Sequence, residues 1–431
     1  MDRNKLIYHH QYGFQQNKST EHNLIHAVNY IGSALNEGKY AVGVFFDLKK
    51  AFDVCSHGIL LKKLKNLGIT GIELEWFSSY LSNRKQCVDI NGTLSDSNDV
   101  TISILQGSIL GPILFLCFIN DLHTVTDMLM LMFADDTFCA KSDFDLNKLI
   151  KYVNGEINKM AVWFRANKLA VNVKKTKYMI FRTASKKLDK NIPDLIFDEN
   201  EPNVPTNTEL INTLERYHNN HVSKDCRAYK LLGIYFDEHL TLNHHVNYLR
   251  NKLSRSMYCI RQAKNLLTKK SLKSLYYALV HSHLTYCPTI LGIINAKNRK
   301  QIETIQKKAI RVITNSKYND HTAPLFKKLN ILPYDKIILQ SKLHFMHSIE
   351  YEYAPSSFSN IWVKNINRQI NHDLRNNDLY NLPQIRLELF RKIPLYSIPY
   401  EWNNLGNMTF HRNKTLFRNL LKEKLINDIS D

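Results

Sequence analysis

The chain has 431 residues, of which 44% are hydrophobic, enough for about two or three apolar cores, which excludes disorder as the main state. Lys and Arg number 58 against 39 Asp and Glu, a formal net charge of +19. A polyanion is therefore the expected partner, with nucleic acid ahead of an acidic membrane surface. The cysteines form no CxxC pair, and the most apolar run, residues 109–119, is too short to span a bilayer. We expect an intracellular protein, nuclear or cytoplasmic, that is not secreted and does not enter a membrane.

The first 182 residues alternate helical and strand-like patterns, which indicates an α/β or α+β domain. Apolar residues at spacings of three and four predict helices, whereas short continuous apolar runs predict buried strands. Helices are expected around residues 24–35, 60–67, 76–80 and 146–164, and strands at residues 40–46, 128–133, 137–140 and 177–181. Ser19 and Thr20 are candidate caps of the first helix, and Gly68 is the expected residue after the second. The strands on either side of Ala134 are predicted to form a hairpin.

Beyond residue 182 the composition changes in three steps. Residues 183–228 are polar and rich in Asn, Lys and Pro, so they are predicted to be a linker or a surface insertion. Residues 229–295 begin with a short apolar strand at 229–236 and continue as a helical region rich in Arg and Lys. Residues 296–431 are basic and helical in places. Of all the regions, this is the one whose role the sequence indicates least.

Three aspartates stand where an unpaired charge would be costly. Asp47 follows the apolar run 42–46, and Asp135 and Asp136 lie between two apolar runs at the predicted turn. A cation is the simplest compensation, and oxygen ligands without a nearby His or Cys favour Mg²⁺ over zinc. Phosphoryl transfer by two metal ions uses such a cluster. Taken alone, an Asp at a strand end or in a turn is more often structural than a ligand, so the wider pattern decides.

Six short motifs occur in one order along residues 11–300. They are Gln11-Tyr12-Gly13-Phe14, Phe46-Asp47 with Phe52-Asp53, Gln106-Gly107-Ser108, Phe133-Ala134-Asp135-Asp136, Asn172-Val173-Lys174-Lys175-Thr176, and Leu231-Leu232-Gly233-Ile234. In this order they resemble the reverse transcriptases of non-LTR retrotransposons of the Jockey type. The resemblance implies an α+β fold: a right-hand polymerase palm with flanking helices, a helical thumb and a basic C-terminal extension. It implies partial fingers and palm at residues 1–182, a polar linker or insertion at 183–228, a primer-grip and thumb-like region at 229–295, and the extension at 296–431.

The resemblance also implies an activity, RNA-templated DNA synthesis. A primer 3′-hydroxyl would attack the α-phosphate of a deoxynucleoside triphosphate with two Mg²⁺ ions, so RNA template, DNA primer and deoxynucleoside triphosphates are the implied partners. The implied catalytic residues and metal ligands are Asp47, Asp135 and Asp136. The implied nucleotide-binding residues are Phe52, Gln106, Gly107 and Lys175, with Phe52 screening the sugar 2′ position.

Several of these residues also have a plainer interpretation. Phe52 could equally be an aromatic residue of the core, and Lys175 could be a solvated surface charge. His57 is expected to be a hydrogen-bonding residue at a helix start. A group of basic residues in the helical region has few acids interleaved, which favours contact with nucleic-acid phosphates over a solvated face. This group comprises Arg250, Lys252, Arg255 and Arg261.

The chain departs from the family pattern at three positions. Ser103 and Leu105 stand where the family usually has Gly and Pro, and Gln15 replaces the usual Arg. Because the chain begins at the Gly13-Phe14 segment, we expect upstream fingers and an endonuclease domain to be missing, so that a fragment binds primer-template better than it extends it. The alternative is a catalytically impaired nucleic-acid-binding remnant. A weaker alternative is an intron-maturase-like protein that holds structured RNA.

Overall fold

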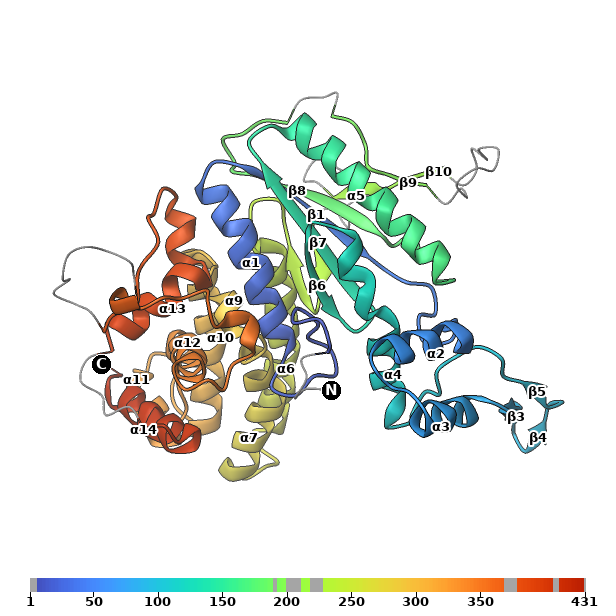
Figure 1. Cartoon of the computed structure of the whole chain (residues 1–431). Helices are drawn as coiled ribbons and strands as arrows, with labels where there is room; N and C mark the ends of the chain where they lie inside the picture. The colour runs from blue at the N-terminus through green and yellow to red at the C-terminus, as the bar shows by residue number, and fades with distance from the viewer. Residues whose placement is uncertain are drawn as a thin grey trace. The chain divides into compact units, whose positions relative to one another are not determined.

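The computed structural model describes residues 6–188, 192–198, 211–217, 228–367, 378–405 and 411–429. The chain divides into two compact units, whose elements are labelled in Figure 1. Unit 1 comprises Met1–Gln16, Tyr40–Ile180 and Ser185–Tyr217, and unit 2 comprises Asn17–Lys39, Phe181–Ala184 and His218–Asp431. No helix within the described ranges is long and apolar enough to cross a membrane.

Unit 1 is built on a five-stranded sheet in the order β11-β8-β1-β7-β6. Its strands are β1 (Tyr40–Phe46), β6 (Leu129–Phe133), β7 (Asp136–Asp143), β8 (Lys177–Phe181) and β11 (Glu215–Tyr217). β7 pairs antiparallel with both β1 and β6, whereas β11 pairs parallel with β8. The buried residues of β1 and β8 form continuous runs, as expected for strands covered on both faces.

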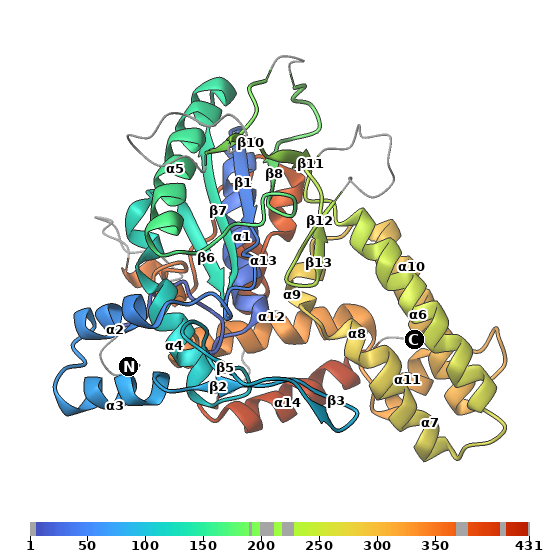
Figure 2. The ribbon, with the colours of Figure 1, turned by 90° about the vertical axis from the view of Figure 1, so that its right-hand side faces the viewer.

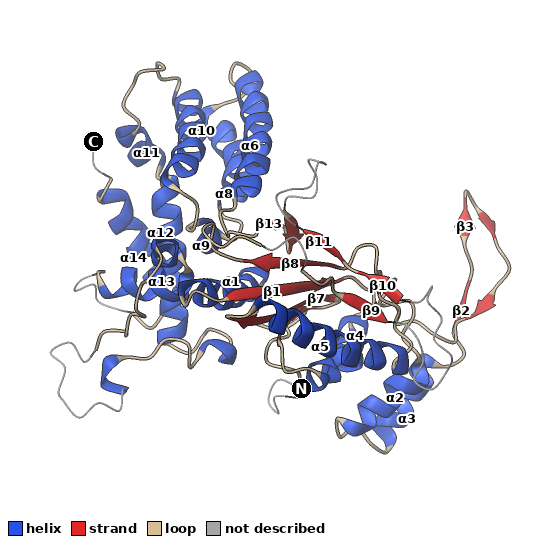
Figure 3. Cartoon of the chain, turned by 90° about the horizontal axis from the view of Figure 1, so that it is seen from above, coloured by secondary structure: helices blue, strands red, loops and turns tan. Residues whose placement is uncertain are grey.

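Helices cover this sheet and enclose one hydrophobic core. They are α2 (His57–Asn66), α3 (Ile72–Leu81), α4 (Leu110–Ile119) and α5 (Leu146–Ala166), with a 3-10 helix at Asn120–Val125. α5 packs against β1 and β7 and lies along the sheet in Figure 3. Its apolar stripe, which includes Val153, Ile157 and Met160, is fully buried because those residues recur on one helical face. The alternating patterns left α/β and α+β open, and the antiparallel pairing of β1, β6 and β7 with helices around the sheet is consistent with the α+β class.

Short strands complete unit 1. They are β2 (Lys85–Gln86), β3 (Asp89–Ile90), β4 (Thr93–Leu94), β5 (Asn98–Asp99), β9 (Ile196–Asp198) and β10 (Ile211–Thr213). β9, β10 and β11 all fall within residues 183–228, the predicted linker or insertion, and Leu195, Phe197 and Leu214 are buried in the core. Residues 189–191, 199–210 and 218–227 of that segment lie outside the described residues. The domain boundaries at residues 182, 228 and 295 stay predictions.

Unit 2 is predominantly helical. Its elements are α1 (Thr20–Asn36), β12 (Tyr229–Leu231), β13 (Ile234–Phe236), α6 (Asn243–Ala263), α7 (Lys269–Tyr276), a π-helical turn (Tyr277–His281), α8 (Ser282–Leu284), α9 (Pro288–Leu291), α10 (Ala296–Thr314), α11 (Ala323–Leu329), α12 (Tyr334–Glu350), α13 (Pro394–Asn403) and α14 (Lys414–Asn427), with 3-10 turns at Ser356–Phe358, Asn365–Asn367 and Glu388–Lys392. α6 and α10 pack side by side, as Figure 2 shows. α1 begins at the predicted cap, where the Ser19 hydroxyl accepts the N–H of His22.

One predicted strand was wrong. The apolar run 229–236 is a hairpin of two short strands, because Leu232 and Gly233 adopt φ values of 42° and 86° and form a tight turn. The Tyr286 hydroxyl donates a hydrogen bond to the Leu232 carbonyl at 2.6 Å. The turn could not be predicted from the sequence because the apolar run is continuous and leucine rarely adopts the left-handed region.

Polar residues of α1 bind distant parts of unit 2. The Asn29 side-chain oxygen accepts the N–H of Leu395, and the Asn36 side-chain oxygen accepts the N–H groups of Arg386 and Leu387. These bonds give partners to the side-chain oxygens of the buried Asn29 and Asn36, which would otherwise cost stability. Little in the sequence indicated a role for the region from residue 296 onward. In the structure, this region supplies part of the environment that holds α1.

Candidate active site

Asp47 is held at the end of β1 by the segment that precedes β8. Its backbone N–H donates to the Thr176 hydroxyl at 3.2 Å, and its carbonyl accepts the N–H of Asn172 at 2.7 Å. The next residue, Leu48, forms an isolated bridge with Val171. These bonds fix the backbone, while 32% of the Asp47 side chain stays exposed. The carboxylate therefore lies at the rim of the core, as the apolar run before it predicted.

Asp135 and Asp136 lie at the turn between β6 and β7. Phe133 pairs with Asp136, so Ala134 and Asp135 are the two connecting residues, and Ala134 adopts a left-handed φ of 57°. This confirms the predicted hairpin. β1 and β7 are in register with Phe46 opposite Thr137. Because those strands are antiparallel, the residue after Phe46 and the residue before Thr137 lie at the same edge of the sheet, which places Asp47 beside Asp136.

The three carboxylates also influence one another electrostatically. Loss of hydrating water, together with the negative charges of Asp135 and Asp47, raises the pKa of Asp136 to about 6. A cation near the group would reverse that effect. Lys175 supplies one positive charge, since its Nζ lies 3.9 Å from Oδ2 of Asp47.

The donor chemistry of the three aspartates fits a hard divalent cation, because carboxylate oxygens are the ligands that Mg²⁺ prefers. Nevertheless, among the described residues no three His, Cys, Asp or Glu side chains are grouped so that they could hold a metal ion.

The loop before Gln106 is bonded to the loop after Asp47. The N–H of Ser103 donates to the Cys55 carbonyl, and the N–H of Ile104 donates to the Phe52 carbonyl, each at 2.9 Å. His57 begins α2, and its Nε2 bonds to the Ser103 carbonyl at 2.8 Å. His57 therefore has the hydrogen-bonding position at a helix start that the sequence predicted.

Two predicted nucleotide-binding residues lie on this loop. The Gln106 amide donates to the Asp53 carboxylate at 2.8 Å, which links the second and third motifs through side chains. Gly107 adopts a φ of 82°, which a glycine reaches without strain. The loop that contains Gln106 and Gly107 is therefore bonded to the segment that contains Phe52. Lys175 lies beside Asp47.

Phe52 is half-buried and packs against other aromatic side chains. Its ring stacks on Phe115 with a centroid separation of 4.3 Å, and it meets the edge of Phe14 at 6.5 Å. Phe14 is 55% exposed. One face of Phe52 therefore contacts the core, and its role as a screen for the sugar stays a prediction.

The predicted nucleic-acid-binding residues all lie on α6 of unit 2. Arg250 and Lys252 are half-buried, whereas Arg255 and Arg261 are exposed. The helix contains no acidic residue, so none of these cations has an acid within its own helix. Lys252 lies over the ring of Tyr248 at 5.7 Å.

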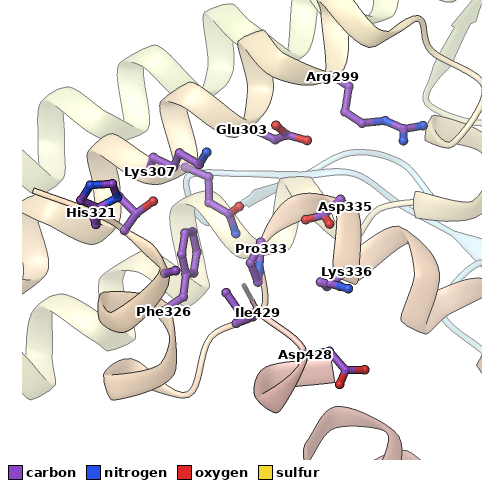
Figure 4. Close-up of a pocket in the computed structure, with 13 residues that line it drawn as sticks. Arg299, Glu303, Lys307, His321, Phe326, Pro333, Asp335, Lys336, Asp428 and Ile429 are labelled. Atoms are coloured by element: carbon purple, nitrogen blue, oxygen red, sulfur yellow. The ribbon is translucent and has the colours of Figure 1, made fainter. Parts of the chain in front are cut away.

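A hollow of about 560 Å³ in unit 2 was not anticipated from the sequence. It is formed by α10, the start of α11, the start of α12 and the end of the chain after α14 (Figure 4). Its lining contains both signs of charge, with Arg299, Lys307 and Lys336 on one side of the balance and Glu303, Asp335 and Asp428 on the other. None of the predicted site residues lines it.

The sequence also contained no signal for a buried contact at the N-terminal end of unit 1. Gln11 and Tyr12 are 2% and 1% exposed, and both bond to the end of the hairpin that carries Asp135. Gln11 and its partner Ala134 are 123 positions apart, so their contact produces no pattern in the local sequence.

A profile of the family described as reverse transcriptase (RNA-dependent DNA polymerase) matches residues 1–279. The chain therefore belongs to the reverse transcriptase family.

Among curated proteins, the chain is similar to polymerases of non-LTR retrotransposons. It is 27% identical over 344 residues to the RNA-directed DNA polymerase from mobile element jockey of Drosophila melanogaster, a match that covers 77% of this chain and 34% of that protein. It is 26% identical to the probable RNA-directed DNA polymerase from transposon BS of the same organism, covering 77% of this chain and 35% of the relative. The predicted family resemblance is confirmed. The chain spans about a third of the length of the curated relatives it matches.

Among solved structures, apo telomerase from Candida tropicalis is similar with a TM-score of 0.38 and 10% sequence identity. The match covers 83% of this chain and 57% of that one. A likeness at this level carries no argument about the site.

Ser103 is expected to strain the loop, which gives a first prediction. Its φ of 104° lies where residues with a side chain are rarely found, and the family usually has glycine there. Ser103→Gly keeps both backbone bonds and should raise the free energy of unfolding by about 1 kcal/mol, since strain relief exceeds the added chain entropy. Urea unfolding measures the change.

Ser108→Gly is the matched control. The Ser108 hydroxyl accepts the N–H of Gly111 at 2.9 Å, so its removal should lower stability. A Ser103→Gly variant that unfolds at a lower urea concentration than the parent would show that φ at this position carries no strain.

Proposed function

We propose that the chain is the polymerase region of a retrotransposon reverse transcriptase that copies RNA into DNA. One observation carries this: Asp47 at the end of β1 and Asp135–Asp136 at the β6–β7 turn are coupled carboxylates at one edge of the sheet, inside the family match. The names of the relatives support RNA-directed DNA synthesis. Template RNA, primer DNA and deoxynucleoside triphosphates are the proposed partners.

The finer fold assignment belongs to the same proposal. The sheet of unit 1 with α4 and α5 would be the palm of a right-hand polymerase. The β12–β13 hairpin and the helices α6 and α7 would be the primer grip and the thumb. Residues 296–431 would be the basic C-terminal extension. The acid-free sequence of α6 supports a helix that tracks a phosphate backbone.

Asp47, Asp135 and Asp136 would hold two Mg²⁺ ions. Bound there, such ions would lower the pKa of the primer hydroxyl and neutralise charge on the triphosphate. Asp136, whose pKa of about 6 leaves it mostly ionised at neutral pH, would become a full ligand once a cation offsets its neighbours. The hydrogen bonds to Asn172 and Thr176 keep the backbone of Asp47 in place.

Other residues would position the nucleotide. Lys175, already beside Asp47, can turn its ammonium group toward the triphosphate. Gln106 and Gly107 would frame the base pair from a loop that is bonded to the motif containing Phe52. Phe52 would exclude a ribose 2′-hydroxyl by its bulk. The alternative, a nucleic-acid-binding remnant that cannot polymerise, predicts binding without any primer extension.

The carboxylates give the second prediction. Asp135→Asn and Asp47→Asn keep the side-chain shape but remove a charge, so kcat for primer extension on an RNA template with Mg²⁺ should fall by roughly a thousandfold or more. Binding of primer-template should change little. Asp96→Asn, in an exposed connection between β4 and β5, is the control and should extend normally. Near-parental extension by Asp135→Asn would remove Asp135 from the site.

Phe52 gives the third prediction. Phe52→Val shortens the side chain beside Phe115, so ribonucleotides that the parent rejects should be incorporated at least about tenfold better. The ratio of kcat/KM for a deoxynucleotide and the matching ribonucleotide measures this. Phe14→Leu removes a neighbouring exposed aromatic without adding a β-branched side chain at a φ of 52°, and should leave the ratio unchanged. If both variants keep the parental ratio, Phe52 is a core residue only.

The charges of α6 give the fourth prediction. Replacing Arg250, Lys252, Arg255 and Arg261 with Gln should weaken nucleic-acid binding at every sequence and flatten its salt dependence, by roughly one unit of slope for each lost phosphate contact. A matched variant replaces four lysines of α10, Lys297, Lys300, Lys307 and Lys308, and removes the same net charge. Equal slopes in the two variants would mean that α6 contributes only through net charge.

A further inference from the structure

The segment before α1 extends the sheet of unit 1 beyond β6. Gln11 forms a parallel bridge with Met132 of β6. The N–H of Tyr12 donates to the Met132 carbonyl at 2.8 Å, and the N–H of Met132 donates to the His10 carbonyl at 3.0 Å. β6 is an outer strand of the five-stranded sheet, so these bonds pair backbone groups that the edge would otherwise leave open.

The Gln11 side chain then reaches into the turn that carries the carboxylates. Its Oε1 accepts the N–H of Ala134 and the N–H of Gly13, both at 2.9 Å. Its Nε2 donates to the Ala134 carbonyl at 3.4 Å. One amide therefore binds both the N–H and the C=O of Ala134, the residue directly before Asp135.

This pair of bonds fixes the conformation of the turn. Ala134 adopts a φ of 57°, where an alanine is disfavoured by roughly 1 kcal/mol or more, so the turn needs outside support. The N–H of Ala134 belongs to the peptide before it and the C=O to the peptide after it. Binding both groups sets the two peptide planes, and with them the direction in which Asp135 and Asp136 leave the backbone. Because Gln11 is buried, water does not compete for these bonds.

Gly13 allows the approach. A Cβ built on Gly13 would lie 2.3 Å from the Ala134 nitrogen and 3.0 Å from the Phe133 carbonyl carbon. Both are backbone atoms and cannot move aside without moving the turn. The absence of a side chain at residue 13 is therefore a steric requirement for the contact between this segment and the turn.

We infer that Gln11 is a positioning residue of the metal site, whose amide holds the Ala134 turn so that Asp135 and Asp136 can converge with Asp47 on a divalent cation. The inference rests on the proposed function for the role of the three carboxylates. Residues that orient metal ligands from behind commonly change metal affinity by about 10- to 100-fold when removed. The signature of this role is accordingly a shift in metal dependence, which a residue that only supports folding would not produce.

The test uses Gln11→Met, which keeps the length of the side chain and removes its hydrogen bonds. Mn²⁺ binding to the free chain, measured by calorimetry, should weaken about tenfold or more, and the Mg²⁺ concentration for half-maximal primer extension should rise by a similar factor. The Kd for primer-template should stay within about twofold, because no predicted phosphate contact is touched.

Two further variants separate positioning from folding. Gln11→Glu keeps the oxygen that accepts the N–H groups of Ala134 and Gly13 but loses the donor to the Ala134 carbonyl, so it should lose less Mn²⁺ affinity than Gln11→Met without reaching the parent. Gly13→Ala leaves Gln11 in place but pushes on the turn, and should weaken Mn²⁺ binding as Gln11→Met does. Gln15→Met removes an amide that bonds only to the Phe14 carbonyl among the described contacts and should behave as the parent. Thermal melting of each variant shows whether it is folded at the assay temperature.

The outcomes distinguish this inference from the proposed function. If the parent depends on Asp135 for Mn²⁺ binding and extension, but Gln11→Met and Gly13→Ala keep parental metal dependence while folded, the inference is overturned and the proposed function stands. If Asp135→Asn binds Mn²⁺ as the parent does and extends primers normally, the carboxylate site itself is wrong, and the inference falls with it. Weakened Mn²⁺ binding in both variants, with a smaller loss in Gln11→Glu, supports the role of Gln11.

Discussion

The register between β1 and β7 is the constraint on which the candidate site depends. Phe46 lies opposite Thr137, so the aspartate after one strand and the aspartate before the other meet at the same edge. A slip of one residue would turn every side chain of β1 to the other face of the sheet and move Asp47 away from Asp136. The packing of Phe45 against Phe138, with ring centroids 5.1 Å apart, opposes that slip because both rings are buried.

The same register brings three negative charges together at the edge of the sheet. Partial loss of water and the charges of Asp135 and Asp47 together raise the pKa of Asp136 to about 6. Lys175 offsets part of this charge near Asp47, but it stays largely exposed, with 71% of its side chain accessible, so solvent screens the attraction. A partly exposed cluster of like charges with one screened cation favours an added cation, which is the physical basis for the proposed metal site.

Much of unit 1 could be predicted from the sequence because its signals are local. The run at residues 40–46 became β1 with the same bounds, and the turn at Ala134 and Asp135 followed from apolar runs on either side. The predicted strand at 229–236 failed because the left-handed turn at Leu232 and Gly233 lies inside an apolar run. β9 to β11 were missed because polar residues dominate that segment. The roles of the site residues stay predictions, since they depend on ligands that a strand pattern does not encode.

The support of the carboxylate turn could not be predicted, because it is the least local feature of the site. Gln11 and Ala134 are 123 positions apart, and the chain leaves unit 1 for unit 2 between residues 17 and 39 before it returns as β1. Closing so long a loop has an entropic cost that grows only slowly with length, and the hydrogen bonds of Gln11 and Tyr12 help to offset it. The hairpin itself rests on contacts between neighbouring strands, whereas the turn that carries its carboxylates is held by a segment distant in the sequence. A change at Gln11 or Gly13 should therefore disturb the turn more than the pairing of β6 with β7.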